Sequence, residues 1–97
     1  MDPIMAQLRA RYLASFPEKC ALIVAALEAI PEHSGAKIDL RILCHKLAGS
    51  APMYAFEQLG QAARAACAAI DDGASPDTVL KRVRDVVALL EVPETTE

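Results

Sequence analysis

The segment from Ser75 to Leu90 reads SPDTVLKRVRDVVALL and has the clearest helix signal in the chain. Ser75 is a good N-cap residue, Pro76 suits the first helical position, and Asp77 places an acid in the first turn. Apolar residues then recur every three or four positions, at Val79, Leu80, Val83, Val86, Val87 and Leu90. This spacing predicts an amphipathic helix with one face in a protein core.

Proline and glycine divide the rest of the chain into four more segments with helical spacing. These segments run from Asp2 to Phe16, from Pro17 to about Ile30, from about Ala36 to Pro52, and from about Ala55 to Asp72. The loop 31–35 separates the second segment from the third, and Gly73 is a suitable helix C-cap. The last residues, 93–97, are expected to form a frayed polar tail.

The composition also favours helices. The chain has 97 residues, enough for one domain, of which 54% are hydrophobic and only 4% aromatic. Nineteen residues are alanine, the best helix former, whereas strands favour aromatic and β-branched residues. We therefore expect a single all-α domain over residues 1–97. Its expected architecture is an antiparallel up-down four-helix bundle with a short N-terminal capping helix.

Charge and cysteine content exclude several classes of function. The net charge of −3 argues against nucleic acid as a partner, and no apolar run is long enough to span a membrane. The N-terminus lacks the pattern of a signal peptide, which favours a cytoplasmic protein. Cys20, Cys44 and Cys67 are too widely spaced for a disulfide framework or a metal site. We expect no bound metal, and a monomer.

The third segment has apolar residues on two faces. At about 100° per residue, Leu40, Leu43, Leu47 and Ala51 fall on one side, which is the expected core face. His45 lies about 140° from Leu40 and points away from that face. The outward side around His45 also holds uncharged residues, namely Ile38, Ile42, Gly49 and Pro52.

Two interpretations of this outward face remain open. In the first, neighbouring helices cover it and His45 is a half-buried helical histidine. In the second, it is an exposed apolar docking surface with an imidazole at its centre. Gly49 favours the second, because glycine inside a helix costs about 1 kcal/mol relative to alanine. A glycine one turn after His45 leaves access to the ring, while Lys46 and Ser50 offer a positive charge and a hydroxyl donor.

The run His45-Lys46-Leu47-Ala48-Gly49-Ser50-Ala51, followed by Phe56 and Leu59, resembles the signature of histidine-containing phosphotransfer (HPt) domains. That signature is roughly His-x-Leu-Lys-Gly-Ser-Ser/Ala with a later Gly-x-x-x-Leu. The family fold is a four-helix bundle with an N-terminal capping helix. The chain departs from the signature where Ala48 replaces a lysine, Ala55 replaces the later glycine, and Pro52 replaces a small residue.

The resemblance implies that His45 carries a phosphoryl group between aspartates of receiver domains. For that role, our candidate neighbours of the phosphoryl group are Lys46, Gly49 and Ser50, with Lys46 supplying the positive charge that is missing at Ala48. The candidate docking surface includes Ile38, Arg41, Ile42 and Pro52. An equally good interpretation of Lys46 and Arg41 is that they are ordinary solvated surface charges with no role in phosphoryl transfer. The domain would need no cofactor of its own, because the receiver supplies the acidic site and its Mg²⁺. The expected partners are receiver domains of response regulators and hybrid histidine kinases.

Such a chain is a phosphocarrier rather than an enzyme, and no phosphate-binding loop for ATP is present. The main alternative is a helical adaptor that binds a protein through the face around His45 without being phosphorylated. A cysteine- or histidine-dependent enzyme is disfavoured, because Cys44 and His45 are adjacent on a helix and point about 100° apart.

Overall fold

The computed structural model describes residues 1–95 and contains α-helices joined by short loops, with no strand in that range. The elements are α1 Pro3–Ala14, α2 Phe16–Ala29, α3 Gly35–Ser50, the 3₁₀ turn η1 Ala51–Tyr54, α4 Glu57–Asp71, and α5 Pro76–Glu91. The second helix begins one residue before the predicted Pro17. The third ends at Ser50 and passes directly into η1, which contains Pro52.

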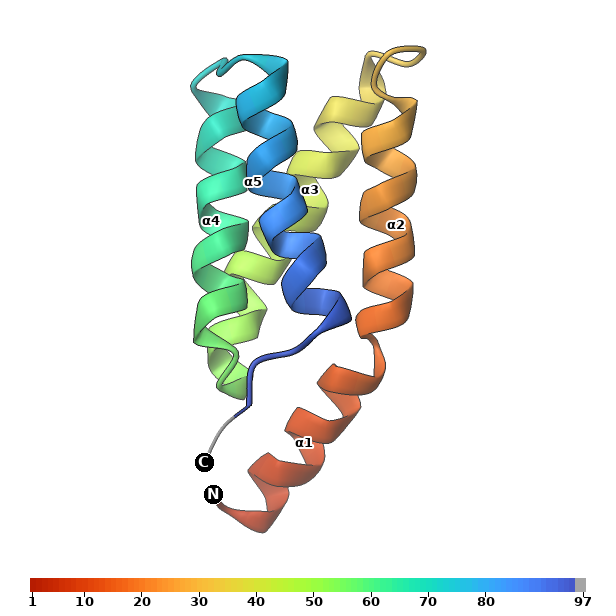
Figure 1. The fold of residues 1–97 in the computed structure, drawn as a ribbon. Coiled ribbons are helices and arrows are strands. Elements are labelled where there is room, and N and C mark those ends of the chain that lie inside the picture. The colour runs from red at the N-terminus through yellow and green to blue at the C-terminus, as the bar shows by residue number, and fades with distance from the viewer. Residues whose placement is uncertain (96–97) are drawn as a thin grey trace.

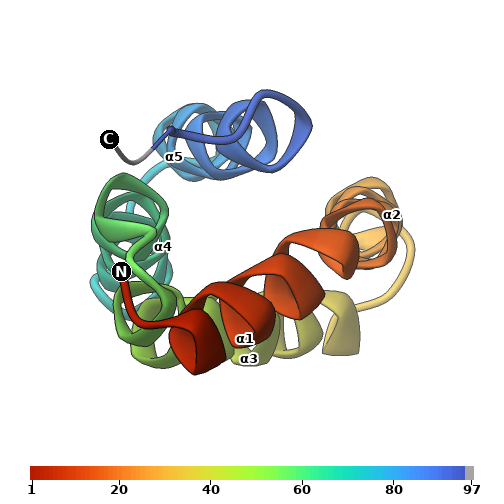
Figure 2. The ribbon, with the colours of Figure 1, turned by 90° about the horizontal axis from the view of Figure 1, so that it is seen from below.

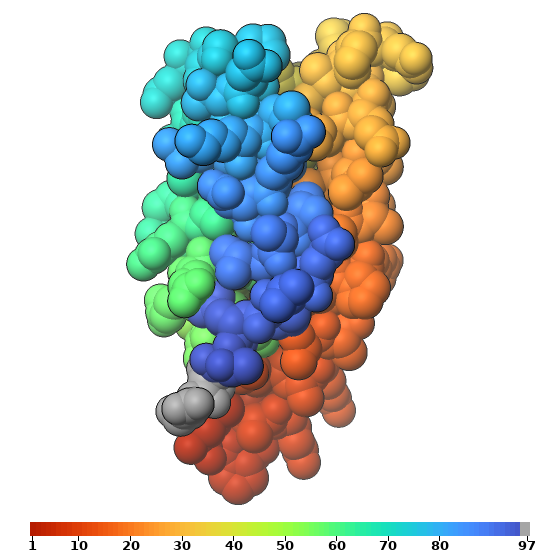
Figure 3. Space-filling view, in the orientation of Figure 1, coloured from red at the N-terminus to blue at the C-terminus, as the bar shows by residue number. Residues whose placement is uncertain are grey.

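Helices α2 to α5 form an antiparallel bundle in which each packs against the next and α5 returns to α2 (Figure 1). Helix α1 lies across the end of the bundle, where it contacts α2 and η1 (Figure 2). In the space-filling view, side chains of α5 meet those of α2 along the front of the molecule (Figure 3). The predicted all-α bundle with an N-terminal capping helix is therefore confirmed.

The predicted helix starts have the expected caps. Ser75 Oγ accepts a hydrogen bond from the Thr78 amide at 3.3 Å, and Asp2 Oδ1 accepts one from the Ile4 amide at 2.8 Å. Both residues satisfy an amide that has no partner within the helix. Gly73 adopts a positive φ of 68° after α4, a conformation that glycine takes without steric cost. Within the described residues, no helix is both long and apolar enough to cross a membrane.

The core is built from the inward faces of α2 to α5. Leu40, Leu47 and Ala51 are buried as predicted. Leu43, by contrast, is only partly buried, and Cys44 is fully buried. The core-facing side of α3 is therefore centred closer to Cys44, and thus towards α4, than the apolar spacing predicts. Cys44 and Cys67 are small buried core residues, and Cys20 is partly buried against the same core.

Aromatic side chains join the capping helix to the bundle. Phe16 and Phe56 are buried with ring centroids 5.0 Å apart, and Tyr12 of α1 lies 5.6 Å from Phe16 and 5.8 Å from Phe56. The Arg9 guanidinium lies over the Phe56 ring, with its central carbon 3.9 Å from the centroid. These contacts fix α1 at the end of the bundle where α3 ends and α4 begins.

The C-terminal tail is anchored at Glu94. The Glu94 carboxylate accepts hydrogen bonds from the backbone amides of Gln58 at 3.0 Å and Leu59 at 2.9 Å, at the start of α4. Phe56, which precedes α4, provides no side-chain cap, so Glu94 takes that place from a distant part of the chain. The prediction of a frayed tail is therefore wrong for Glu94, and residues 96–97 lie outside the described residues.

Candidate functional site

His45 lies in the middle of α3 and is exposed. The preceding residue, Cys44, is completely buried, and Leu47 is also buried, so the helix directs His45 away from the core. No hydrogen bond to its imidazole is formed by any of residues 1–95. The structure thus contradicts the interpretation in which neighbouring helices cover this histidine. His45 is therefore on the solvent-exposed side of α3.

The apolar residues around His45 are also uncovered. Ile38 is 63% exposed and Ile42 is 43% exposed, although both are large aliphatic side chains in one helix. Leu22 of α2 is 50% exposed and faces the same region. An exposed isoleucine pair one turn apart is unusual on a solvated helix face, and it extends the apolar area towards α2.

A groove runs between α2 and α3 beside this face. Leu22 and Leu43 line both of its hollows, which have volumes of about 440 Å³ and 260 Å³. Ile42 lies in the larger hollow, while Lys19 and Lys46 lie in the smaller one. Sequence analysis did not identify Leu22 as part of this surface. Leu22 is an apolar residue outside the predicted buried face of the second segment, and that position could have indicated its exposure.

Gly49 lies on the same exposed face, one turn after His45. A Cβ built at Gly49 would meet no heavy atom within 4 Å. Packing within the chain therefore does not require glycine here. Alanine at this position would stabilise the helix by about 1 kcal/mol relative to glycine. Gly49 therefore lowers the stability of α3, and no contact within the molecule explains why glycine is present.

The Ser50 hydroxyl is already engaged within the chain. Ser50 Oγ donates to the Lys46 carbonyl at 2.8 Å and lies 2.6 Å from the hydroxyl oxygen of Tyr12. Burial raises the pKa of Tyr12, so this phenol stays protonated and can donate to Ser50. Since a serine hydroxyl has one proton, Ser50 has no further donor for a group on His45. Its observed role is to link α1 to the end of α3.

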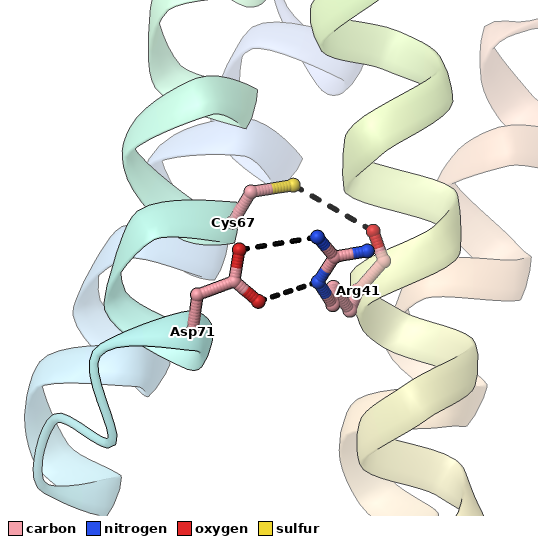
Figure 4. A network of polar contacts seen from close by, with 3 residues as sticks. All are labelled: Arg41, Cys67 and Asp71. Carbon is pink, nitrogen blue, oxygen red and sulfur yellow. Dashed lines mark hydrogen bonds and ion pairs between the residues drawn. The ribbon is translucent and has the colours of Figure 1, made fainter.

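Lys46 and Arg41 lie on opposite sides of His45. Lys46 is exposed on the α2 side, in the smaller hollow of the groove. Arg41 lies on the α4 side and forms a two-pronged ion pair with Asp71, with Nε 2.5 Å from Oδ1 and Nη2 3.1 Å from Oδ2 (Figure 4). The sequence predicts the exposed positions of both cations but gives no indication of the Asp71 partner.

Asp71 is the acidic partner of Arg41 on the α4 side of His45. The hydrogen bonds from Arg41 lower the pKa of Asp71, and the charge of His45 lowers it further. The pKa of Arg41 is raised by the same hydrogen bonds. The side chains of Arg41 and Asp71 are 42% and 47% exposed, so the pair is solvated and can rearrange. Cys67 Sγ contacts the Arg41 carbonyl oxygen at 3.6 Å beside it (Figure 4).

Pro52 was expected on the docking surface, but in the structure it packs against α4. It is half-buried in η1, and its ring lies against Gly60 of α4. The contact joins the end of α3 to the first turns of α4. Of the four residues expected for docking, Ile38 and Ile42 are therefore free, whereas Arg41 and Pro52 already have partners in the chain.

The other reactive side chains are poorly placed for chemistry. Burial raises the pKa of the Cys44 thiol to about 12, so it is not a nucleophile at neutral pH. Cys44 is buried and His45 exposed, so these two neighbouring side chains point in different directions, as helix geometry predicts. Nowhere in residues 1–95 do three histidine, cysteine or carboxylate side chains gather as a metal site would require.

The site is thus a single exposed imidazole on α3, with Gly49, the exposed isoleucines, Arg41 and Lys46 around it. Comparison of the chain with protein-family models, with curated proteins and with solved structures gives no match.

Proposed function

We propose that this chain is a phosphocarrier of the histidine-containing phosphotransfer type, acting in the cytoplasm, and that His45 is its phosphoacceptor. The observation that carries the proposal is the free, exposed imidazole of His45 on the outer face of α3. It is supported by the resemblance of residues 45–51 to the HPt signature and by a fold of the kind that the resemblance implies.

The chemistry requires little from this chain besides His45. The lone pair of a neutral imidazole attacks the phosphorus of a receiver aspartyl phosphate, forming an N–P bond as the O–P bond breaks. The aspartate leaves as a carboxylate, and the proton on the other ring nitrogen can pass to solvent because the ring is exposed. Transfer to a second receiver is the reverse reaction on another aspartate.

Phosphoryl transfer depends mainly on in-line positioning and on neutralising charge. A receiver brings the aspartate and its Mg²⁺, so the carrier contributes the nucleophile and a surface that orients it. The absence of a base hydrogen-bonded to His45 among residues 1–95 is compatible with this division of work.

The docking surface that we propose consists of Ile38, Ile42 and Leu22, with Gly49 next to the imidazole. These apolar side chains are 63%, 43% and 50% exposed for Ile38, Ile42 and Leu22, and they extend from α3 to the α2 side of the groove. A partner that covers them would remove apolar surface from water, and this removal is the main favourable term in most protein associations. Gly49 would let the partner's phosphorylated aspartate approach the ring closely.

The rival function is an adaptor that uses the same surface without phosphorylation. The exposed isoleucines support it equally well, but Gly49 favours the phosphocarrier. A purely apolar interface gains nothing from a glycine where alanine would add both helix stability and contact area.

The test is transfer of labelled phosphate from phosphorylated receiver domains. We expect the chain to acquire phosphate that is labile in acid and stable in alkali, as expected for phosphohistidine. His45→Gln should abolish the label, whereas His33→Gln, which alters the only other histidine, should leave it unchanged. Transfer to the His45→Gln protein, or no transfer from any cognate receiver, would overturn the proposal. Receiver binding without transfer would identify the adaptor.

A further inference from the structure

Two charged side chains, Arg41 and Asp71, lie on the α4 side of His45. Arg41 precedes His45 by one turn of α3, and Asp71 of α4 binds the Arg41 guanidinium through both carboxylate oxygens (Figure 4). Arg41 and His45 are four residues apart and therefore neighbours on the surface of α3, so the guanidinium that Asp71 binds projects from the turn next to the imidazole.

Phosphorylation of His45 would change the charge balance at this point. A phosphoryl group carries about −1.5 to −2 charges near pH 7, so it would introduce a second anion beside Asp71. Residues four apart on a helix have Cβ atoms about 5–6 Å apart, and helical side chains lean towards the N-terminus. The ring of His45 therefore leans towards Arg41, whose planar guanidinium fits phosphate as well as carboxylate.

The other candidate donors are worse placed. By helix geometry Arg41 lies only about 40° around α3 from His45, whereas Lys46 lies about 100° away on the α2 side. Ser50 already uses its hydroxyl proton on the Lys46 carbonyl. Ala48, which also lies on the Arg41 side, has no charge.

On the basis of the proposed function, we propose that Arg41 contacts the phosphoryl group of phosphorylated His45, and that Asp71 competes for the same guanidinium. In the unphosphorylated protein, Asp71 holds Arg41. In the phosphorylated protein, the guanidinium is shared with or transferred to the phosphoryl oxygens. Only ion-pair contacts are exchanged, so no covalent bond or proton needs to be accounted for. Asp71 thereby limits how strongly the carrier retains its phosphoryl group.

The test is the second ionisation of the phosphoryl group on His45, followed by ³¹P NMR. Phosphoramidate, a chemical phosphodonor for histidine, is used with the His33→Gln protein so that a single phosphohistidine forms. A nearby cation favours the dianion, so Arg41→Ala should raise the pKa of the phosphoryl group. Asp71→Asn, which removes an anion and frees Arg41, should lower it. We expect each shift to be about half a pH unit, which is typical of an exposed ion pair.

Competition predicts that these effects are not additive. Arg41→Ala should raise the phosphoryl pKa more in the Asp71→Asn background than in the parent protein, because the free guanidinium then interacts with the phosphoryl group alone. Arg41→Lys should restore part of the Arg41→Ala effect. The matched controls are Arg84→Ala and Asp85→Asn, which make the same charge changes at exposed positions of α5, a helix that is not an immediate neighbour of α3 in the described bundle.

Two negative results would have different meanings. If Arg41→Ala shifts the phosphoryl pKa no more than Arg84→Ala in either background, the Arg41 contact is wrong, and the proposed function is unaffected. If receivers fail to transfer phosphate while the chemically phosphorylated protein shows the expected shifts, the proposed function is wrong and the Arg41 contact remains. Both side chains are substantially exposed, so neither substitution removes a buried contact from the core.

Discussion

The ring of Pro52 lies against Gly60 so closely that a Cβ at position 60 would come within 2.5 Å of Pro52 Cγ and 2.8 Å of Cδ. The first residue belongs to the 3₁₀ turn that follows α3, and the second to the first turns of α4. This contact sets how closely the helix that carries His45 approaches its neighbour. A proline ring is rigid, so it cannot move away from an added methyl group without moving the backbone of η1.

We therefore predict that Gly60→Ala destabilises the protein. Overpacking costs about 1–3 kcal/mol, while alanine returns about 1 kcal/mol of helix propensity, so the net loss should be up to about 2 kcal/mol. Urea denaturation measures this loss. The double variant Pro52→Ala/Gly60→Ala should lose less than Gly60→Ala alone. If the double variant is no more stable than Gly60→Ala, the close contact does not exist in solution.

Ala55 adopts left-handed backbone angles, with φ 66° and ψ 28°, between η1 and α4. For a residue with a Cβ, this conformation costs roughly 1–2 kcal/mol. Glycine avoids that steric cost, but it makes the unfolded chain more flexible, which lowers the free energy of unfolding by about 0.4–1 kcal/mol. Ala55→Gly should therefore raise the free energy of unfolding by up to about 1 kcal/mol. Gly73→Ala, at φ 68°, should do the opposite and serves as the control. A loss of stability in Ala55→Gly would contradict the left-handed assignment.

Glu94 caps α4 from the C-terminal end of the chain, through the amides of Gln58 and Leu59. We expect Glu94→Ala to lower the free energy of unfolding by about 1 kcal/mol, as loss of a helix N-cap does. Amide hydrogen exchange should accelerate at Gln58 and Leu59. Thr95→Ala, which alters the next residue in the chain, is the control and should change neither quantity. Unchanged exchange in Glu94→Ala would show that the tail is free in solution.

The sequence predicts the features of this molecule that depend on local signals. The helix from Pro76 is recognisable because its cap, its proline and its apolar spacing all fall within one short segment. The outward direction of His45 follows from its angle to Leu40, and the structure confirms it. In both cases, the information lies within a few helical turns of the residue concerned.

The unpredicted features are contacts between residues far apart in the chain. Arg41 and Asp71 are 30 positions apart, and Tyr12 and Ser50 are 38 apart. Helical spacing indicates that Ser50 and Arg41 lie off the core face, but not which neighbouring helix lies beside them. The sequence therefore predicts a donor role for Ser50 but gives no indication of its hydrogen bond with Tyr12, which depends on how α1 packs against the end of α3.

Gly49 provides the sharpest prediction about the candidate site. Nothing lies within 4 Å of the position of its missing Cβ, so Gly49→Ala should stabilise α3 by about 1 kcal/mol. The same methyl group would occupy the surface beside His45 and slow phosphoryl transfer from a receiver. A docking role for Gly49 therefore predicts a variant that is more stable and transfers phosphate more slowly. If Gly49 affected folding alone, the variant would be more stable and its transfer rate would not change.

The control for Gly49→Ala is Gly35→Ala, at the first residue of α3, where an added Cβ also meets no atom within 4 Å. Gly35 lies almost three helical turns from His45, so this variant should leave the transfer rate unchanged. Stability is measured by thermal unfolding and transfer by the initial rate of labelling from a phosphorylated receiver. If Gly49→Ala is more stable and transfers phosphate as fast as the parent protein, the receiver does not approach His45 over Gly49. The docking surface would then have to lie on the opposite side of the imidazole.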